Sequence, residues 1–206
     1  MSEFFQVNSH NPDQRVINRA VDCLLSGGVI VYPTDSMYAL GCHIGQKTPL
    51  DRIRQLRKLD QRHNFTLVCS DLSSLSSYAQ VGNSAYRILK AYTPGPYTFI
   101  LKATPEVPRR LMNPKRKTIG IRVPDNRIAQ AIIDKLGNPM MSTSLILPEL
   151  DTQLTDAYEM RLKLGTRVDM IIDGGSCGLE PTTMIDLVEG TPSILRVGKG
   201  NPEPFE

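Results

Sequence analysis

Hydroxyl and arginine side chains that could hold an anion stand at the ends of several apolar segments. In VIVYPTDSMYALGC (29–42), an apolar run up to Tyr32 is interrupted by the polar stretch PTDS (33–36), which contains Thr34, before the chain turns apolar again. The other members of this set are Thr98, Arg122, Ser142, Thr143, Ser144, Thr182, Thr183 and Arg196. Ligands of open α/β sheets bind at strand ends, where such groups hold anions by hydrogen bonds. The pattern predicts one polar site shared by several strands.

Each of these positions also has a structural explanation. Serine and threonine are common in turns, and threonine is common in strands. A strand arginine is often an edge residue or half of an ion pair. The recurrence at several strand ends favours a ligand site, while each single position stays open to either interpretation.

Familiar catalytic and metal-binding motifs are absent. The sequence has neither a Walker-type phosphate loop nor a G-x-S-x-G turn. Its cysteines and histidines have no metal-ligand spacing. Asp169 and Asp173 would share one face of a strand and could bind Mg²⁺ or form ion pairs. Because the cysteines and histidines lack metal-ligand spacing, we expect no permanently bound metal.

Basic residues form two clusters. The first cluster holds Arg52, Arg54, Arg57, Lys58, Arg62 and His63, and the second holds Arg109, Arg110, Lys115, Arg116 and Lys117. Such runs are commonly solvated surface, but two clusters that met in space would form a surface for phosphates. Aromatic residues make up only 6% of the chain, which disfavours stacking on single strands. Structured or double-stranded RNA, or a nucleoside triphosphate, remains as a partner.

Composition is typical of a globular domain. The 206 residues are 40% hydrophobic and 22% charged, and we expect a single domain over 1–206. No apolar run approaches the length of a membrane span, and the N-terminus does not resemble a signal peptide, so no membrane partner is expected. With unpaired cysteines, this predicts a cytoplasmic protein.

Hydrophobic periodicity predicts alternating helices and strands. Helices are expected from a cap at Asn11-Pro12 to Gly27-Gly28, from a cap at Asn83 to about Tyr92, and over 49–59, 126–136 and 156–164. A loop or short helix is expected at 109–117. Strands are expected over 29–32, 65–69, 118–124, 139–145, 168–173, 182–188 and 193–198, and PGPYTFIL (94–101) is expected to be a rigid turn that leads into a strand. This order predicts an α/β fold with a mixed, twisted, mostly buried sheet flanked by helices.

Six segments occur together in a recognisable order. They are VYPTDSMYALGC (31–42), PGPYTFIL (94–101), TIGIRVP (118–124), PMMSTS (139–144), PTTMIDL (181–187) and ILRVG (194–198). Together they resemble the YrdC/YciO family across nearly the whole chain. The basic stretches RHNFTL (62–67) and KRKTIGIRVP (115–124) resemble its YciO branch. The resemblance implies a twisted open sheet with a large, basic, concave cavity.

The resemblance also implies a chemistry. The synthase branch makes threonylcarbamoyl-adenylate from L-threonine, bicarbonate and ATP with Mg²⁺ for the modification of adenosine 37 in transfer RNA, and family members are described as binding double-stranded RNA. By position, Thr34 would contribute to the threonine pocket. The residues expected to hold substrate and phosphates, or to line the same cavity, are Arg122, Ser142, Thr143, Ser144, Thr98, Thr182 and Arg196. A carbamate attacks the α-phosphorus, so alignment and cations suffice without a strong base.

This chain departs from the synthase pattern at two motifs. The K-x-R motif of synthases is replaced by Arg57-Lys58-Leu59, and their S-x-N motif by Ser144-Leu145-Ile146. Arg57, Lys58 and Ser144 are the candidate catalytic residues. The sequence favours a YciO-type protein that binds nucleotide and transfer or ribosomal RNA, with weak or altered adenylate chemistry. An active threonylcarbamoyl-adenylate synthase, or a regulatory protein with a vestigial pocket, are the alternatives.

Overall fold

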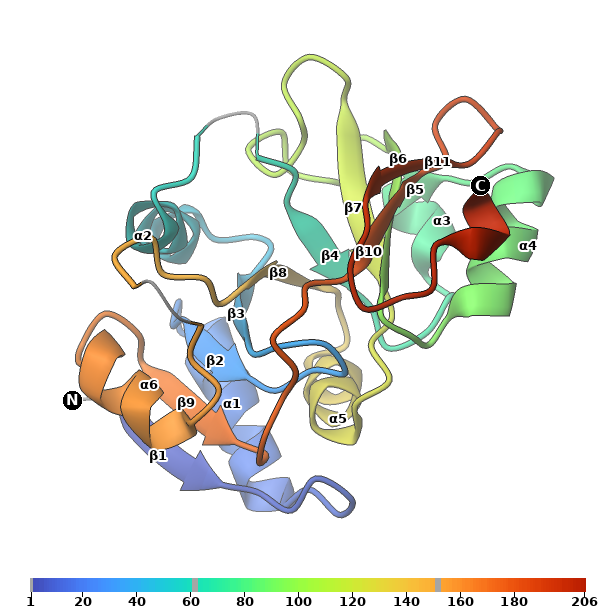
Figure 1. Cartoon of the computed structure of the whole chain (residues 1–206). Helices are drawn as coiled ribbons and strands as arrows, with labels where there is room; N and C mark the ends of the chain where they lie inside the picture. The colour runs from blue at the N-terminus through green and yellow to red at the C-terminus, as the bar shows by residue number, and fades with distance from the viewer. Residues whose placement is uncertain (1, 61–62, 151–152) are drawn as a thin grey trace.

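The computed structural model describes residues 2–60, 63–150 and 153–206, and the strands in these ranges form one mixed sheet (Figure 1). Across the sheet their order is β1 (Glu3–Gln6), β9 (Met170–Asp173), β2 (Ile30–Tyr32), β3 (Ala39–His43), β8 (Met140–Ser144), β4 (Thr66–Val68), β7 (Thr118–Arg122), β6 (Tyr97–Ala103), β10 (Thr183–Asp186) and β11 (Ser193–Arg196). The short β5 (Ala79–Gln80) also pairs with β6.

Parallel and antiparallel pairs alternate irregularly along this order. The pairs β1–β9, β2–β9, β4–β7 and β6–β10 are parallel, and the pairs β2–β3, β3–β8, β4–β8, β6–β7 and β10–β11 are antiparallel. The predicted α/β fold with a mixed sheet flanked by helices is therefore confirmed.

Helices cover both faces of the sheet (Figure 1). The helical elements are α1 (Gln14–Leu25), α2 (Lys47–Arg57), α3 (Leu75–Tyr78), α4 (Asn83–Tyr92), α5 (Arg127–Leu136), α6 (Ala157–Leu164) and a 3₁₀ turn at Glu203–Phe205. The apolar faces of α1 and α5 pack on Ile30 and Met140, whereas α2, α4 and α6 pack with Val31 and Met141. Neighbouring strand residues point to opposite faces, which explains why the continuous apolar runs are buried on both sides.

Several expected boundaries are wrong. The cap of α1 is Asp13, whose carboxylate accepts a hydrogen bond from the Arg15 amide at 2.8 Å, so Asn11-Pro12 precedes the helix. Asn83 is the first residue of α4 rather than its cap, which is Gly82. Helix α2 ends at Arg57 because Lys58 takes a left-handed conformation with φ 49°. For residues 109–117, where a loop or a short helix was expected, the structure has turns, so the loop is confirmed.

Strands β1 and β3 were not predicted. Strand β3 contains Gly41, and a Cβ atom added there would lie 2.7 Å from Met140 Sδ, so a larger residue would have to displace the Met140 side chain. Within the described ranges, no helix is long and apolar enough to cross a bilayer. Cys23, Cys42, Cys69 and Cys177 are free thiols.

Candidate functional site

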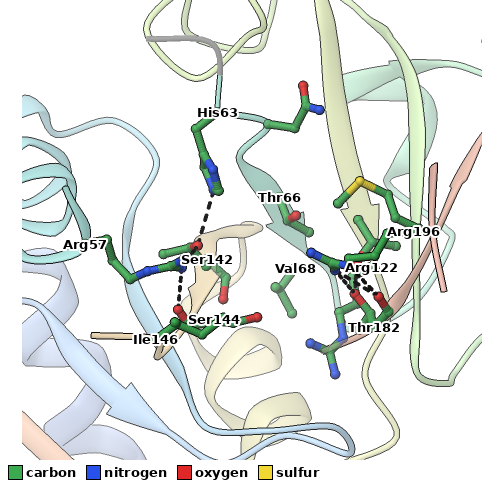
Figure 2. A pocket seen from close by; sticks show the side chains of 14 residues that line it. Arg57, His63, Thr66, Val68, Arg122, Ser142, Ser144, Ile146, Thr182 and Arg196 are labelled. Carbon is green, nitrogen blue, oxygen red and sulfur yellow. Dashed lines mark hydrogen bonds between the residues drawn. The ribbon is translucent and has the colours of Figure 1, made fainter. Parts of the chain in front are cut away.

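A pocket of about 500 Å³, including space open to solvent, lies over the strand ends of β8, β4, β7 and β10 (Figure 2). Its described lining residues are Arg57, His63, Asn64, Thr66, Val68, Thr98, Arg122, Ser142, Thr143, Ser144, Ile146, Thr182, Met184 and Arg196. The structure thus brings together the residues named from strand ends and Arg57, except for Thr34 and Thr183.

Arg122 explains the polar interruption after Tyr32. Its Nη2 atom donates to Thr34 Oγ1 at 3.1 Å, to Ser36 Oγ at 2.9 Å and to the Asp35 carboxylate. The side chains of Arg122 and Asp35 are only 8% and 11% exposed. Thr34 therefore lies behind the pocket wall, where it fixes Arg122. Among the residues that the structure describes, Nη1 of this arginine has no recorded partner.

Arg57 occupies the C-terminal end of α2 and reaches across to β8. Its Nη1 atom donates to Thr143 Oγ1 at 2.8 Å and to the Ser144 carbonyl at 2.6 Å. Burial, and then the charge of Arg196, lower the pKa of the Arg57 guanidinium to about 10, so it is still charged at neutral pH. Within the described residues, its Nη2 atom has no recorded partner.

Arg196 lies on the other side of the pocket, beside Arg122 and Thr182 (Figure 2). Its Nε and Nη2 atoms donate to the Thr182 carbonyl at 3.1 and 2.8 Å, and Nη2 also lies 3.2 Å from Thr182 Oγ1. The hydroxyls of Thr182 and Thr98 are 2.7 Å apart. Burial, and then Arg122, lower the pKa of Arg196.

The site is electropositive. Three guanidinium groups line it, and none of the described lining residues is acidic. Burial, and then the charge of Arg57, lower the pKa of the lining residue His63 to about 4, so the imidazole is neutral at pH 7. Arg57 and Arg122 each bind the protein through one Nη atom, and Arg196 through Nε and Nη2. The other Nη atom of each arginine has no recorded partner among the described residues. This arrangement suits phosphate or carboxylate oxygens.

Sequence reasoning missed several lining residues. Thr66 and Val68 come from β4 and face the same side, because side chains alternate along a strand. His63 and Asn64 come from the segment before β4, and Met184 from β10. Alternation within the predicted strands was the available signal for Thr66, Val68 and Met184. Ser142 is fixed from below by the buried Tyr32 hydroxyl, at 2.7 Å.

Other candidates lie outside the pocket. Lys58 is exposed and is not a lining residue. Leu59 packs partly buried against the hydrophobic core. Asp169 forms an ion pair with Arg52 at 2.7 Å, and Asp173 accepts from the Gly175 amide at 3.0 Å. Within the described part of the chain, no group of acidic, histidine or cysteine side chains could hold a metal ion.

The two basic clusters meet at one point. Arg54 Nη2 donates to the Arg110 carbonyl at 2.8 Å, and Arg110 Nη2 donates to the Ile44 carbonyl at 3.1 Å. Arg116 pairs with Asp186 at 2.7 Å. The cations that project into solvent here are Arg109, Lys115, Arg116 and Lys117. Arg62 lies outside the described residues.

Comparisons with a family model, with related sequences and with solved structures all point to the same family. The Sua5/YciO/YrdC family model, described as telomere recombination, matches residues 22–198. YciO of Escherichia coli is 55% identical over 205 residues, covering 100% of both chains, and its crystal structure matches with a TM-score of 0.96.

More distant relatives carry an activity in their names. A threonylcarbamoyl-AMP synthase of Coxiella burnetii is 29% identical over 183 residues, covering 88% of this chain and 96% of the relative. The crystal structure of P. abyssi Sua5 complexed with L-threonine shares the fold, with a TM-score of 0.90 and 24% identity over 98% of this chain and 59% of that chain. With fold, motif order and family match in agreement, this chain is a member of the Sua5/YciO/YrdC family and is related to threonylcarbamoyl-AMP synthases.

Proposed function

We propose that the pocket binds a nucleoside triphosphate, ATP in the first instance, and that the adjoining basic surface binds structured RNA. The protein would act in transfer RNA modification or RNA maturation, with weak or altered threonylcarbamoyl-adenylate chemistry. L-Threonine is the second small-molecule ligand expected in the same pocket. The proposal depends on one observation above all, the three arginines whose free Nη atoms surround the pocket.

These arginines are preorganised for a polyanion. Arg57 is held by Thr143 and the Ser144 carbonyl, and Arg196 by Thr182. Arg122 is held by the PTDS segment. Because each guanidinium is already fixed, a ligand loses little affinity to side-chain ordering. Hydroxyls of Ser142, Ser144 and Thr98 add neutral donors between the charges.

The same groups could align the adenylation reaction. In that reaction a carbamate oxygen attacks the α-phosphorus of ATP, and pyrophosphate leaves. Mg²⁺ would arrive bound to the phosphates, since none of the described lining residues is a carboxylate. Cations around the phosphates would neutralise the charge that develops on them. Ile146, in place of a polar residue, leaves one wall of this pocket apolar, which supports altered rather than efficient synthase chemistry.

Replacing Arg57 by methionine should weaken ATP binding about tenfold or more, because a charge-assisted hydrogen bond contributes about 1.5–3 kcal/mol. Lys58→Met should leave the dissociation constant unchanged, since Lys58 is exposed and outside the pocket. Isothermal titration calorimetry with ATP and Mg²⁺ measures both. An equal loss in the two variants would contradict the assignment of Arg57, and absence of ATP binding in the unaltered protein would favour a vestigial pocket.

Substituting Lys115 and Lys117 together by alanine should weaken binding of a structured RNA and reduce the slope of log K against log salt by roughly 2. Both side chains are exposed in the segment between β6 and β7. The control Lys90→Ala/Lys135→Ala removes equal charge from α4 and α5. Fluorescence anisotropy at several salt concentrations measures the slope, and an unchanged slope in the Lys115/Lys117 variant would reject this surface.

A further inference from the structure

His63 is a titratable group in the pocket that the proposed chemistry does not use. Its Nε2 atom lies 3.4 Å from Thr143 Oγ1, which also accepts the hydrogen bond from Arg57 Nη1 at 2.8 Å (Figure 2). The ring packs edge-on against Phe65, with the centroids 5.2 Å apart. An imidazole, a guanidinium and a hydroxyl therefore converge at one point of the wall.

Burial, and then the charged groups around it, lower the pKa of His63 and keep its imidazole neutral at pH 7. Among the described residues, Arg54 and Arg57 of α2 and Arg196 of β11 oppose an imidazolium, and Asp60 on the adjoining segment favours it. Burial disfavours the charged imidazolium most strongly, because it removes the ring from water. A neutral imidazole with its proton on Nδ1 can accept a hydrogen bond at Nε2 from the Thr143 hydroxyl.

An anion in the pocket would act in the opposite direction and favour the charged imidazolium of His63. Negative charge between Arg57 and Arg196 offsets the repulsion that these two guanidiniums exert on an imidazolium. A protonated His63 would donate from Nε2 to Thr143 Oγ1. Since a hydroxyl oxygen accepts two hydrogen bonds, Thr143 could accept from both Arg57 and His63 and turn its own proton towards the ligand. Protonation thus adds a positive charge and frees a hydroxyl donor.

We propose that polyanion binding in this pocket is coupled to protonation of His63, so that the ligand enters together with a proton and binds more tightly as the pH falls. The inference rests on the proposed function insofar as the pocket must bind an anion. Coupling is reciprocal: each unit by which the ligand raises the pKa of His63 tightens binding by up to about tenfold at low pH.

The test follows the three histidine ring signals of the unaltered protein by NMR between pH 3.5 and 8. It is performed in sodium sulfate and in sodium chloride of equal ionic strength. Sulfate is the probe because it does not titrate in this range, unlike ATP. His63→Gln identifies the His63 signal, and His10 and His43, which lie outside the pocket, serve as internal controls.

Saturating sulfate should raise the midpoint of the His63 titration by about one pH unit or more and leave His10 and His43 unchanged. Sulfate affinity, measured from the Thr143 amide signal, should rise about twofold or more from pH 7.5 to pH 5, and this rise should be lost in His63→Gln. Sulfate binding without movement of the His63 midpoint would overturn the coupling and leave the proposed anion site intact. Absence of both sulfate and ATP binding would overturn both.

Discussion

Replacing Arg122 by methionine is expected to lower the free energy of unfolding by about 3–5 kcal/mol, because it leaves the carboxylate of Asp35 buried without its ion-pair partner. The Asp35 side chain is 11% exposed, and its Oδ2 atom already has no hydrogen-bond partner. The substitution also removes the donor that holds Thr34 and Ser36. Urea unfolding followed by circular dichroism measures the loss.

The double variant Arg122→Met/Asp35→Asn separates the buried charge from the lost packing. It should recover a large part of the stability, since no uncompensated charge remains. Arg19→Met, which removes a surface ion pair with Glu3, should barely change stability. If Arg122→Met were as stable as Arg19→Met, the PTDS segment would not depend on this arginine. If the double variant were no more stable than the single one, the buried charge would not be the cause.

Most of the fold was readable because apolar runs of strand length alternate with amphipathic segments. Strand β2 corresponds to the apolar run before Pro33, and β9 to the run at Met170–Asp173, and both are buried on both faces. Strand β3 was not predicted because the apolar residues after PTDS are followed by a glycine. A glycine disfavours a strand unless another part of the protein approaches it closely. That approach, by Met140 of β8, joins residues about a hundred positions apart and leaves no local signal.

The candidate site was only partly readable. Hydroxyls and arginines at strand ends pointed to a shared site, and the sheet order β8–β4–β7–β6–β10 brings most of them to one pocket. That order is not written in the sequence. The contribution of His63 depends on β4 lying beside β8, and the position of Thr34 behind Arg122 depends on contacts 88 residues apart.

The basic clusters show a second limit of sequence reasoning. Counting charges treats every cation as available to a partner. In the structure Arg52 is held by Asp169 and Arg116 by Asp186, while Arg54 binds a backbone carbonyl and lies over the Phe65 ring. Such internal contacts lower the positive charge offered to RNA. They explain why our RNA prediction rests on Lys115 and Lys117, for which no side-chain partner is recorded among the described residues.

The two departures from the synthase pattern are not equivalent in the structure. Ile146 lines the pocket beside Ser144, so a polar side chain there would face the ligand. Leu59 packs against the hydrophobic core, and an arginine at that position would have to leave this contact. Restoring the synthase pattern therefore starts with Arg57 and Ile146, and leaves Leu59 in place.

The variant Arg57→Lys/Ile146→Asn is expected to release pyrophosphate from ATP about ten- to a hundredfold faster than the unaltered protein, when L-threonine and bicarbonate are both present. A lysine offers a compact ammonium at the end of α2, and asparagine adds a donor to the apolar wall. A hydrogen bond to a charged phosphate made in the transition state contributes about 1.5–3 kcal/mol, which corresponds to this range of rates. A coupled pyrophosphate assay at catalytic enzyme concentration measures the rate.

The matched control is Arg57→Lys/Ile146→Leu, because leucine has the shape of asparagine without its amide. If the leucine variant gained as much activity, the gain would come from the shape of the pocket rather than from a hydrogen bond. If the unaltered protein already turned over with threonine-dependent kinetics, the synthase motifs would be dispensable and efficient synthesis would replace our proposal. No threonine dependence in any variant, together with intact ATP binding, would mean that the pocket retains the arginines for nucleotide binding and lacks more of the synthase machinery than these two positions.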